Sequence, residues 1–246
     1  MEFAIIAAGE GSRLVSEGVS VPKPLVDIDG RPMIGRLLDI MGDSGAGSVT
    51  VVVNEQMSEV ADWLRTRDRE PEVVVRVKTT PDSMHTFAEA TAGFDGKFAV
   101  TTVDTIFSPT LFRECVEAFE ADTETDGYMC VTDFIDDEKP LYVAVDSDMN
   151  ITAFHDRREE SDTPYVSAGI YMLTPRALTT RRRCLAEGVT RMRNFQRELI
   201  ADGLWLKARP LGKVIDVYHI SDIATARQMV GEFENQSIQH IKNGRK

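Results

Sequence analysis

The glycine turn that directly follows the first apolar segment constrains the fold most strongly. Residues 3–8 read Phe-Ala-Ile-Ile-Ala-Ala, small or branched apolar residues without alternation, which is typical of a strand buried on both faces of a parallel sheet. Gly9 and Gly11 follow where that strand must end, and glycine lets a ligand approach bare backbone N–H groups. Arg13 adds a forked cation beside those donors. The segment therefore predicts an anion cradle, with phosphates as the best-fitting anions.

Apolar segments of strand and helix type alternate along the first half of the chain. This alternation predicts an α/β fold with a doubly wound, mostly parallel sheet. From residue 126 to residue 175, short apolar segments separated by acidic turns predict a small strand-rich lobe. No Gly-, Ser- or Pro-rich linker marks a boundary, so we expect residues 1–246 to form a single domain.

The composition excludes several classes of partner. The net charge of −12 argues against a nucleic-acid polymer. The three cysteines are scattered and lack metal-site spacing, which favours a reducing compartment. No signal peptide is recognisable, and no apolar run approaches the roughly 20 residues that cross a bilayer. We therefore expect a cytoplasmic protein without a membrane partner. The sequence leaves the oligomeric state open, a homo-oligomer included.

The two glycines alone do not identify the ligand. A Rossmann fingerprint would need a third glycine where Leu14 stands, and the Gly-Lys-Ser/Thr of a P-loop is absent. A second segment strengthens the phosphate hypothesis. Lys23 lies between Pro22 and Pro24, which restrict the backbone and hold its ammonium in place at little entropic cost.

Three segments in order resemble the signature of the sugar-1-phosphate nucleotidyltransferases. They are Ala8-Gly9-x-Gly11-Ser12-Arg13-Leu14, Pro22-Lys23-Pro24-Leu25 and Gly30-Arg31-Pro32-Met33-Ile34. The resemblance implies a Rossmann-like nucleotidyltransferase fold with Arg13 and Lys23 as catalytic cations. It also implies that the nucleoside triphosphate (NTP) lies against the first glycine turn, at Ala7, Ala8, Gly9, Gly11 and Ser12.

The polar segment from Lys78 to Phe87 is expected to form a loop at the carboxyl edge of the sheet, where open α/β folds bind ligands. In the family this region carries a Gly-Thr-Ala-type segment that meets the nucleotide base. Here Ser83, Met84 and His85 stand in that place, so they are nucleotide-binding candidates and the base identity does not transfer. A helix-capping or surface role explains His85 equally well.

Two aspartates are the candidate metal ligands. Asp104 ends the apolar run 98–103, where the family has Gly-Asp and this chain has Val103-Asp104. Most aspartates in such places are turn residues, and the alternative is a Mg²⁺ ligand. Asp216 matches the second metal-binding aspartate of the family. The resemblance therefore implies a Mg²⁺ cofactor held by Asp104 and Asp216.

The resemblance also assigns an acceptor site within the strand-rich stretch. Phe154-His155-Asp156-Arg157 resembles the Phe-x-Glu-Lys segment, in which the acid holds sugar hydroxyls and the base holds phosphate. A surface ion pair is the alternative for Asp156 and Arg157. Ser167 replaces the sugar-binding asparagine of Asn-Ala-Gly-Ile-Tyr, which removes an amide donor. We expect these three residues across the cleft from the glycine turn.

The resemblance implies transfer of a nucleotidyl group from an NTP to a sugar 1-phosphate, giving an NDP-sugar and pyrophosphate. Three alternatives stay open at this point. The acceptor could be a non-sugar phosphate such as phosphocholine, or the domain could sense nucleotides without catalysis. A dinucleotide-dependent oxidoreductase is disfavoured by the missing third glycine.

Overall fold

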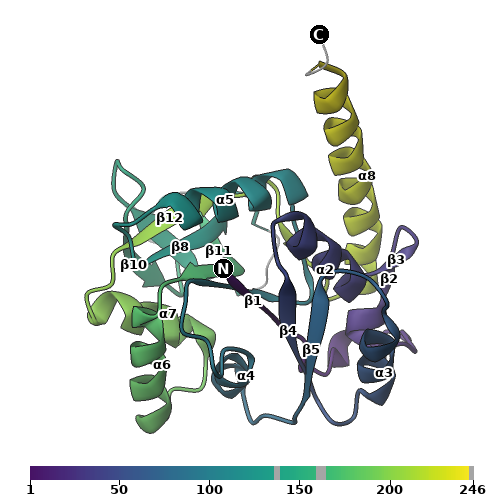
Figure 1. Cartoon of the computed structure of the whole chain (residues 1–246), viewed down its shortest axis with the longest axis horizontal. Helices are drawn as coiled ribbons and strands as arrows, with labels where there is room; N and C mark the ends of the chain where they lie inside the picture. Colours follow the sequence, from purple (N-terminus) through teal and green to yellow (C-terminus); the bar gives the residue numbers. More distant parts are fainter. Residues whose placement is uncertain (136–138, 159–164, 244–246) are drawn as a thin grey trace.

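The computed structural model describes residues 1–135, 139–158 and 165–243. A nine-stranded sheet lies at its centre, with helices packed on both sides (Figure 1). The sheet runs in the order β10-β9-β11-β6-β1-β4-β5, and β8 and β12 join it through β11. None of the helices in the described residues is long and apolar enough to cross a membrane.

The half of the sheet that carries the glycine turn is parallel. Its strands are β1 (Glu2–Ile6), β4 (Ser48–Val53), β5 (Glu72–Val77) and β6 (Phe98–Thr102). Ile6 and Thr102, the last residues of β1 and β6, are register partners, so the chain leaves both strands at the same edge. This places the glycine turn beside Asp104, because each follows one of these strands by a few residues.

The other half of the sheet is largely antiparallel. It consists of β8 (Gly127–Thr132), β9 (Tyr142–Val145), β10 (Ile151–His155), β11 (Val166–Leu173) and β12 (Leu206–Pro210). The strands expected between residues 126 and 175 are present, and the β11–β6 pairing makes them a continuation of the central sheet. Residues 136–138 and 159–164 of that stretch lie outside the described residues.

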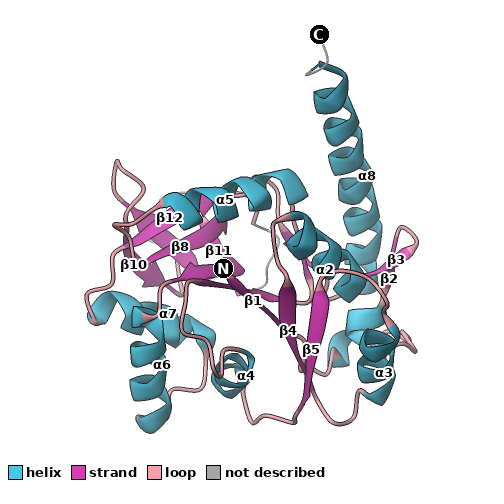
Figure 2. Cartoon of the chain, viewed as in Figure 1, coloured by secondary structure: helices cyan, strands magenta, loops and turns pink. Residues whose placement is uncertain are grey.

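Helices cover both faces of the sheet, which confirms the doubly wound α/β class (Figure 2). One face packs on α2 (Met33–Asp43), α3 (Ser58–Thr66) and α5 (Pro109–Ala121). The other face packs on α4 (Ser83–Ala90), α6 (Arg176–Ala186) and α7 (Met192–Ala201). The first strand shows why its apolar run does not alternate: Phe3 and Ile5 enter one core while Ala4 enters the other.

Short elements at the strand ends build the region around the glycine turn. They are α1 (Ser12–Ser16), the 3₁₀ helix η1 (Lys23–Leu25), the hairpin of β2 (Asp27–Ile28) and β3 (Arg31–Pro32), and the pair of β7 (Thr105–Ile106) and β13 (Ile215–Asp216). The long α8 (Ile220–Asn243) packs its first turns on this region through Ala226, Met229 and Val230. Its distal end extends away from the rest of the chain (Figure 1).

The expected loop from Lys78 to Phe87 is wrong in its second half, because α4 begins at Ser83. The Asp82 carboxylate caps this helix by accepting a hydrogen bond from the His85 amide at 3.0 Å. Met84 and Phe87 are fully buried against the sheet. A polar cap followed by apolar residues at helical spacing overrides the loop-like composition.

Candidate active site

The glycine turn is shaped by Gly11 and left open by Gly9. Gly11 has φ 63°, and a Cβ placed on it would lie 2.8 Å from the Lys23 Cβ. A side chain at this position would therefore be strained and would collide with Lys23. Around Gly9 no other atom lies within 4 Å of an added Cβ, so a ligand can approach the backbone there. The Asn54 amide, at the end of β4, holds the turn by donating to the Ala8 carbonyl at 3.0 Å.

Lys23 and Asp104 form a largely buried ion pair at the floor of this turn. The Lys23 ammonium donates to the Asp104 Oδ2 at 2.5 Å, and the two side chains are 9% and 15% exposed. Losing one partner would leave the other charge in a poorly solvated position, which is costly. The pair therefore fixes a cation and a carboxylate together beside the open backbone of Gly9.

Asp216 reaches the same region through strand pairing. Its register partner in β7 is Thr105, the residue after Asp104, and the Val217 amide donates to the Asp104 carbonyl at 3.0 Å. The Thr105 hydroxyl donates to the Asp216 Oδ1 at 2.8 Å, although 111 residues separate the two in sequence. The fold thus places the two candidate metal ligands on adjacent paired segments.

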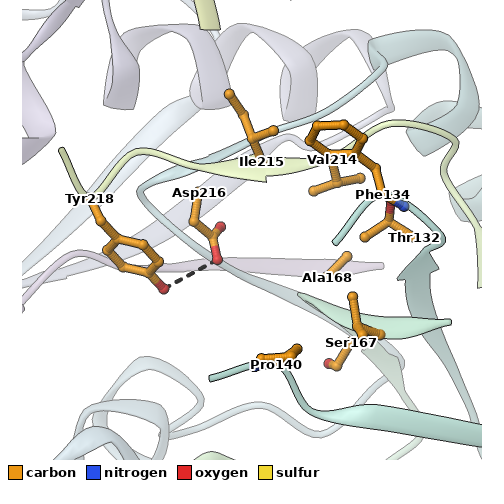
Figure 3. Close-up of a pocket in the computed structure, with 10 residues that line it drawn as sticks. Thr132, Phe134, Pro140, Ser167, Ala168, Val214, Ile215, Asp216 and Tyr218 are labelled. Atoms are coloured by element: carbon orange, nitrogen blue, oxygen red, sulfur yellow. Dashed lines mark hydrogen bonds between the residues drawn. The ribbon is translucent and has the colours of Figure 1, made fainter. Parts of the chain in front are cut away.

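Tyr218 contacts three of the four residues predicted as catalytic cations or metal ligands, namely Arg13, Lys23 and Asp216. Its hydroxyl donates to the Asp216 Oδ2 at 3.2 Å (Figure 3). Its ring centroid lies 4.4 Å from the Lys23 ammonium and 5.1 Å from the Arg13 guanidinium carbon, both within cation–π range. Sequence reasoning missed this role. The available signal was its place two residues after Asp216, which projects both side chains to one side of an extended segment.

A second set of contacts holds the Tyr218 segment against the glycine turn. Glu17, just after α1, accepts from the Ile220 amide at 2.7 Å and contacts the His219 ring at 2.5 Å. The hydrogen bond with His219, and then that from the Ile220 amide, hold the pKa of Glu17 below its ordinary value. Asp222 accepts from the Tyr218 and His219 amides at 2.9 and 2.7 Å.

Two open cavities of similar size meet at Tyr218 and Thr102. The first, which we name the glycine-loop cavity, has a volume of about 380 Å³. The second, the α7 cavity, has a volume of about 400 Å³. The residues that line the first include Gly9, Gly11, Ser12, Arg13, Lys23 and Asp104, and those of the second include Ser83, Ser167, Arg191, Arg193, Gln196 and Asp216. A small third cavity lies where Ser167, Asp216 and Tyr218 approach one another (Figure 3).

Comparison with known proteins identifies the family of this domain. The MobA-like NTP transferase domain family matches residues 3–187, well over half of the 246 residues. The chain belongs to this family.

Relatives with named activities share this domain at low identity. Mannose-1-phosphate guanyltransferase 2 of Candida glabrata is 27% identical over 188 residues, which are 72% of this chain and 51% of the relative. The UTP–glucose-1-phosphate uridylyltransferase AglF of Haloferax volcanii is 26% identical over 178 residues, 71% of this chain and 72% of the relative. The bifunctional IPC transferase and DIPP synthase of Aquifex aeolicus is 29% identical over 114 residues, 46% of this chain and 27% of the relative. The chain thus spans about half, or less, of two of these three relatives.

Solved structures share the fold across nearly the whole chain. The inositol-1-phosphate CTP transferase from T. maritima superposes with a TM-score of 0.78 at 19% identity, covering 95% of this chain and 96% of that one. A UDP-glucose pyrophosphorylase complexed with UDP-glucose gives 0.76 at 15% identity, with coverages of 94% and 98%. At these identities the likeness establishes the nucleotidyltransferase fold.

Within this NTP transferase domain, the three predicted base contacts lie in different surroundings. Ser83 lines the α7 cavity. The Met84 side chain is fully buried in the core, so it faces neither cavity. The His85 ring pairs with Asp82 at 2.9 Å on the exposed first turn of α4, as the capping alternative expected. A nucleotide contact by these residues stays a prediction.

The predicted acceptor residues are also separated by the fold. Ser167 lines the α7 cavity, and its hydroxyl donates to the Gln196 side chain at 3.1 Å. Asp156 is exposed and is bound by Arg197 and Arg193, whose hydrogen bonds lower its pKa. Arg157 is exposed and lines none of the three cavities. The roles assigned to these three residues stay predictions.

Proposed function

We propose that this protein transfers a nucleoside monophosphate from an NTP to a sugar 1-phosphate, releasing pyrophosphate and an NDP-sugar. The main support for this proposal is the Lys23–Asp104 ion pair beside the glycine turn. The pair lines the glycine-loop cavity, which meets the α7 cavity at Tyr218. One cavity fits the triphosphate and the other fits the acceptor. The names of the mannose-1-phosphate and glucose-1-phosphate relatives support this choice of acceptor class.

The proposed reaction is a single in-line displacement at phosphorus. An oxygen of the acceptor phosphate forms a bond to the α-phosphorus, and the bond between that phosphorus and the bridging oxygen to the β-phosphate breaks. No general base is needed, because the attacking phosphate oxygen is already ionised near neutral pH. The protein must align two polyanions and stabilise the charge on the departing pyrophosphate.

The charged residues of the glycine-loop cavity suit these tasks. The Gly9 and Gly11 amides would hold the triphosphate, and the Arg13 fork would bind the leaving pyrophosphate. Lys23 would meet the phosphates at the reacting centre. Tyr218 faces both cations, so it would fix their positions relative to Asp216.

The residues present fit a Mg²⁺ ion. Asp104 and Asp216 lie on adjacent paired segments and offer the hard oxygen ligands that Mg²⁺ prefers. The described residues contain no group of three or more His, Cys, Asp or Glu that could hold a metal. Two carboxylates suffice, because Mg²⁺ usually takes its other ligands from substrate phosphates and water. When bound, it would neutralise charge on the reacting phosphates.

Pyrophosphate release measures the proposed activity directly. The protein is incubated with Mg²⁺, each of ATP, CTP, GTP, UTP and dTTP, and an acceptor panel. The panel holds glucose, mannose and N-acetylglucosamine 1-phosphates, with inositol 1-phosphate and phosphocholine as the non-sugar alternatives. We expect pyrophosphate and a nucleotide-linked product, identified by mass spectrometry, with a sugar 1-phosphate. An NTP that binds in calorimetry without pyrophosphate release for any acceptor would instead favour a sensing domain.

A further inference from the structure

One wall of the α7 cavity is not shared with its neighbours. We name it the α7 wall. It consists of Ser83 at the start of α4 and of Arg191, Met192 and Arg193 at the start of α7. Thr102, Asp216 and Tyr218 also line the cavity, and each of them lines a neighbouring cavity as well. The α7 wall is therefore the end of the cavity that faces away from the proposed reacting centre.

The α7 wall holds an oriented arginine with a shared counter-ion. Arg193 donates through Nη1 to the Asp156 Oδ1 at 2.7 Å and through Nη2 to the Lys139 carbonyl at 2.9 Å. The other Asp156 oxygen lies 2.9 Å from Arg197. The single negative charge of Asp156 is thus shared by the positive charges of Arg193 and Arg197. Among the described residues, this group of three therefore keeps a net positive charge.

Arg191 adds a second cation to the same wall. Arg191 is an exposed residue that lines the cavity, and among the described residues its guanidinium has no hydrogen-bond or ion-pair partner. Guanidinium offers five N–H donors and is permanently charged. An unpaired arginine beside a half-compensated one, in a chain of net charge −12, makes this wall a local site for anions.

The phosphates of the proposed reaction do not account for these cations. The triphosphate has Arg13, Lys23 and the glycine amides in the other cavity. In the proposed reaction the acceptor phosphate lies beside Tyr218 and Thr102, where the two cavities meet, since it attacks the α-phosphorus. The α7 wall then faces the part of the acceptor that is remote from its phosphate.

We infer that the acceptor carries a second acidic group, remote from its phosphate, which Arg191 and Arg193 bind. The inference rests on the proposed function, because it assumes that the α7 cavity holds the acceptor. A carboxylate or a second phosphate presents the same chemistry, two or more oxygens that a planar guanidinium can bind in pairs. The preferred substrates are therefore acidic sugar 1-phosphates or sugar bisphosphates.

Chemically matched acceptors test the inference. Glucose 1-phosphate and glucuronic acid 1-phosphate differ only at C6, as do the galactose and galacturonic acid pair, and glucose 1,6-bisphosphate supplies a second phosphate instead. Binding is measured by calorimetry, and turnover by pyrophosphate release with the best NTP. The variants are Arg191→Met and, as a control of equal charge change, Arg182→Met. Arg182 is exposed on α6, and among the described residues its side chain donates only to the Thr179 hydroxyl, at 3.0 Å.

We expect the acidic member of at least one pair to bind tenfold tighter or more, a typical effect of a charge-assisted contact of roughly 1.5 kcal/mol. Arg191→Met should remove most of this preference, with a much larger loss of affinity for the acidic acceptor than for the neutral one, and Arg182→Met should change neither. Equal binding of acidic and neutral acceptors in every pair overturns the inference, as does an equal loss for both in Arg191→Met. Calorimetry needs no turnover. An acidic preference without pyrophosphate release would therefore reject the proposed function and keep the acidic-ligand site.

Discussion

The glycine-loop cavity and the α7 cavity adjoin at Tyr218 but are built in opposite ways. Most of the polar side chains and open backbone of the first come from residues 9–23 and from one strand end. The second takes side chains from α4, β11, α7 and β13, which are far apart in sequence. A triphosphate is the same in every NTP, so a short segment of backbone and two cations can bind it. Acceptors differ, and the side chains that face them must be brought together by the tertiary fold.

The two cavities also differ in how their charges are compensated. In the glycine-loop cavity, Lys23 is paired with Asp104 before any ligand arrives. In the α7 cavity, the Arg191 guanidinium has no hydrogen-bond or ion-pair partner among the described residues. Substitutions in the first cavity should therefore affect every acceptor alike, whereas substitutions on the α7 wall should affect acidic acceptors selectively.

The largest effect is expected at the two carboxylates. Asp104→Asn and Asp216→Asn should each lower turnover about 100-fold or more, since several kcal/mol of charge stabilisation depend on the metal they would hold. The loss should be the same for every acceptor. Pyrophosphate release titrated with Mg²⁺ measures it, and Asp62→Asn, at an exposed helix position, is the control.

Asparagine is preferred to alanine at Asp104 because its amide oxygen can still accept a hydrogen bond from the buried Lys23 ammonium, although it no longer neutralises that charge. Circular dichroism must show that Asp104→Asn is folded, since an unpaired buried charge destabilises by roughly 3–5 kcal/mol. Near-native turnover in either variant would remove that residue from the metal site.

The next largest effect is expected from conservative exchange of the two cations. Arg13→Lys loses the planar fork, and Lys23→Arg forces a larger group into the contact with Asp104 and Tyr218. Each should lower kcat/KM by roughly 100-fold, the usual value of one strong electrostatic donor. Steady-state kinetics with two acceptors measures this, with Arg65→Lys as the exposed control. Losses below about tenfold for both would contradict a catalytic role.

The glycines provide a matched pair with a smaller effect. Gly11→Ala combines a left-handed backbone with a Cβ 2.8 Å from the Lys23 Cβ, so we expect about 1–2 kcal/mol of destabilisation and roughly a tenfold loss of activity. In Gly9→Ala the added Cβ has no other protein atom within 4 Å. Its free energy of unfolding should therefore lie within about 0.5 kcal/mol of the wild-type value. Urea unfolding and NTP affinity separate the two. Equal destabilisation by both would contradict the observed packing of Lys23 on Gly11.

Tyr218 tests the boundary between the two cavities. Tyr218→Phe keeps the ring over Lys23 and Arg13 but loses the hydrogen bond to Asp216, worth about 0.5–1.5 kcal/mol, so kcat should fall by up to tenfold. Tyr218→Leu also loses the ring contacts with the two cations. Its activation free energy should therefore be higher than that of Tyr218→Phe by about 0.5–2 kcal/mol. Because Tyr218 lines both cavities, KM should rise for both substrates in Tyr218→Leu. Identical kinetics for the two variants would exclude a role for the ring.

The smallest effect is a pH dependence that involves Glu17. In the folded protein the pKa of Glu17 lies below its ordinary value, chiefly because of the hydrogen bond with His219. Glu17 therefore stabilises the fold above about pH 4.5, and this stabilisation is lost as the pH falls through the pKa of the folded state. The melting temperature of wild type should therefore fall more than that of Glu17→Gln between pH 6 and pH 3.5. Parallel curves for the two proteins would show that this contact does not stabilise the Tyr218 segment.

Local sequence was most informative where one segment both forms the structure and carries the ligand groups. The run 3–8 predicted β1, which extends from Glu2 to Ile6. The second half of the expected loop at 78–87 was wrong, because the capping contact of Asp82 starts α4 at Ser83. Capping depends on one side-chain geometry, which composition does not report.

The sequence by itself determined the α/β class and the glycine turn, because strand burial and turn formation are local properties. Its three ordered motifs indicated the nucleotidyltransferase family by resemblance. Only the tertiary structure decided that Lys23 meets Asp104, that Tyr218 joins both cations to Asp216, and that Arg191 and Arg193 face the second cavity. The longest of these contacts, between Arg13 and Tyr218, joins residues 205 positions apart. Their geometry follows from strand pairing and helix packing, which no single stretch of the chain specifies.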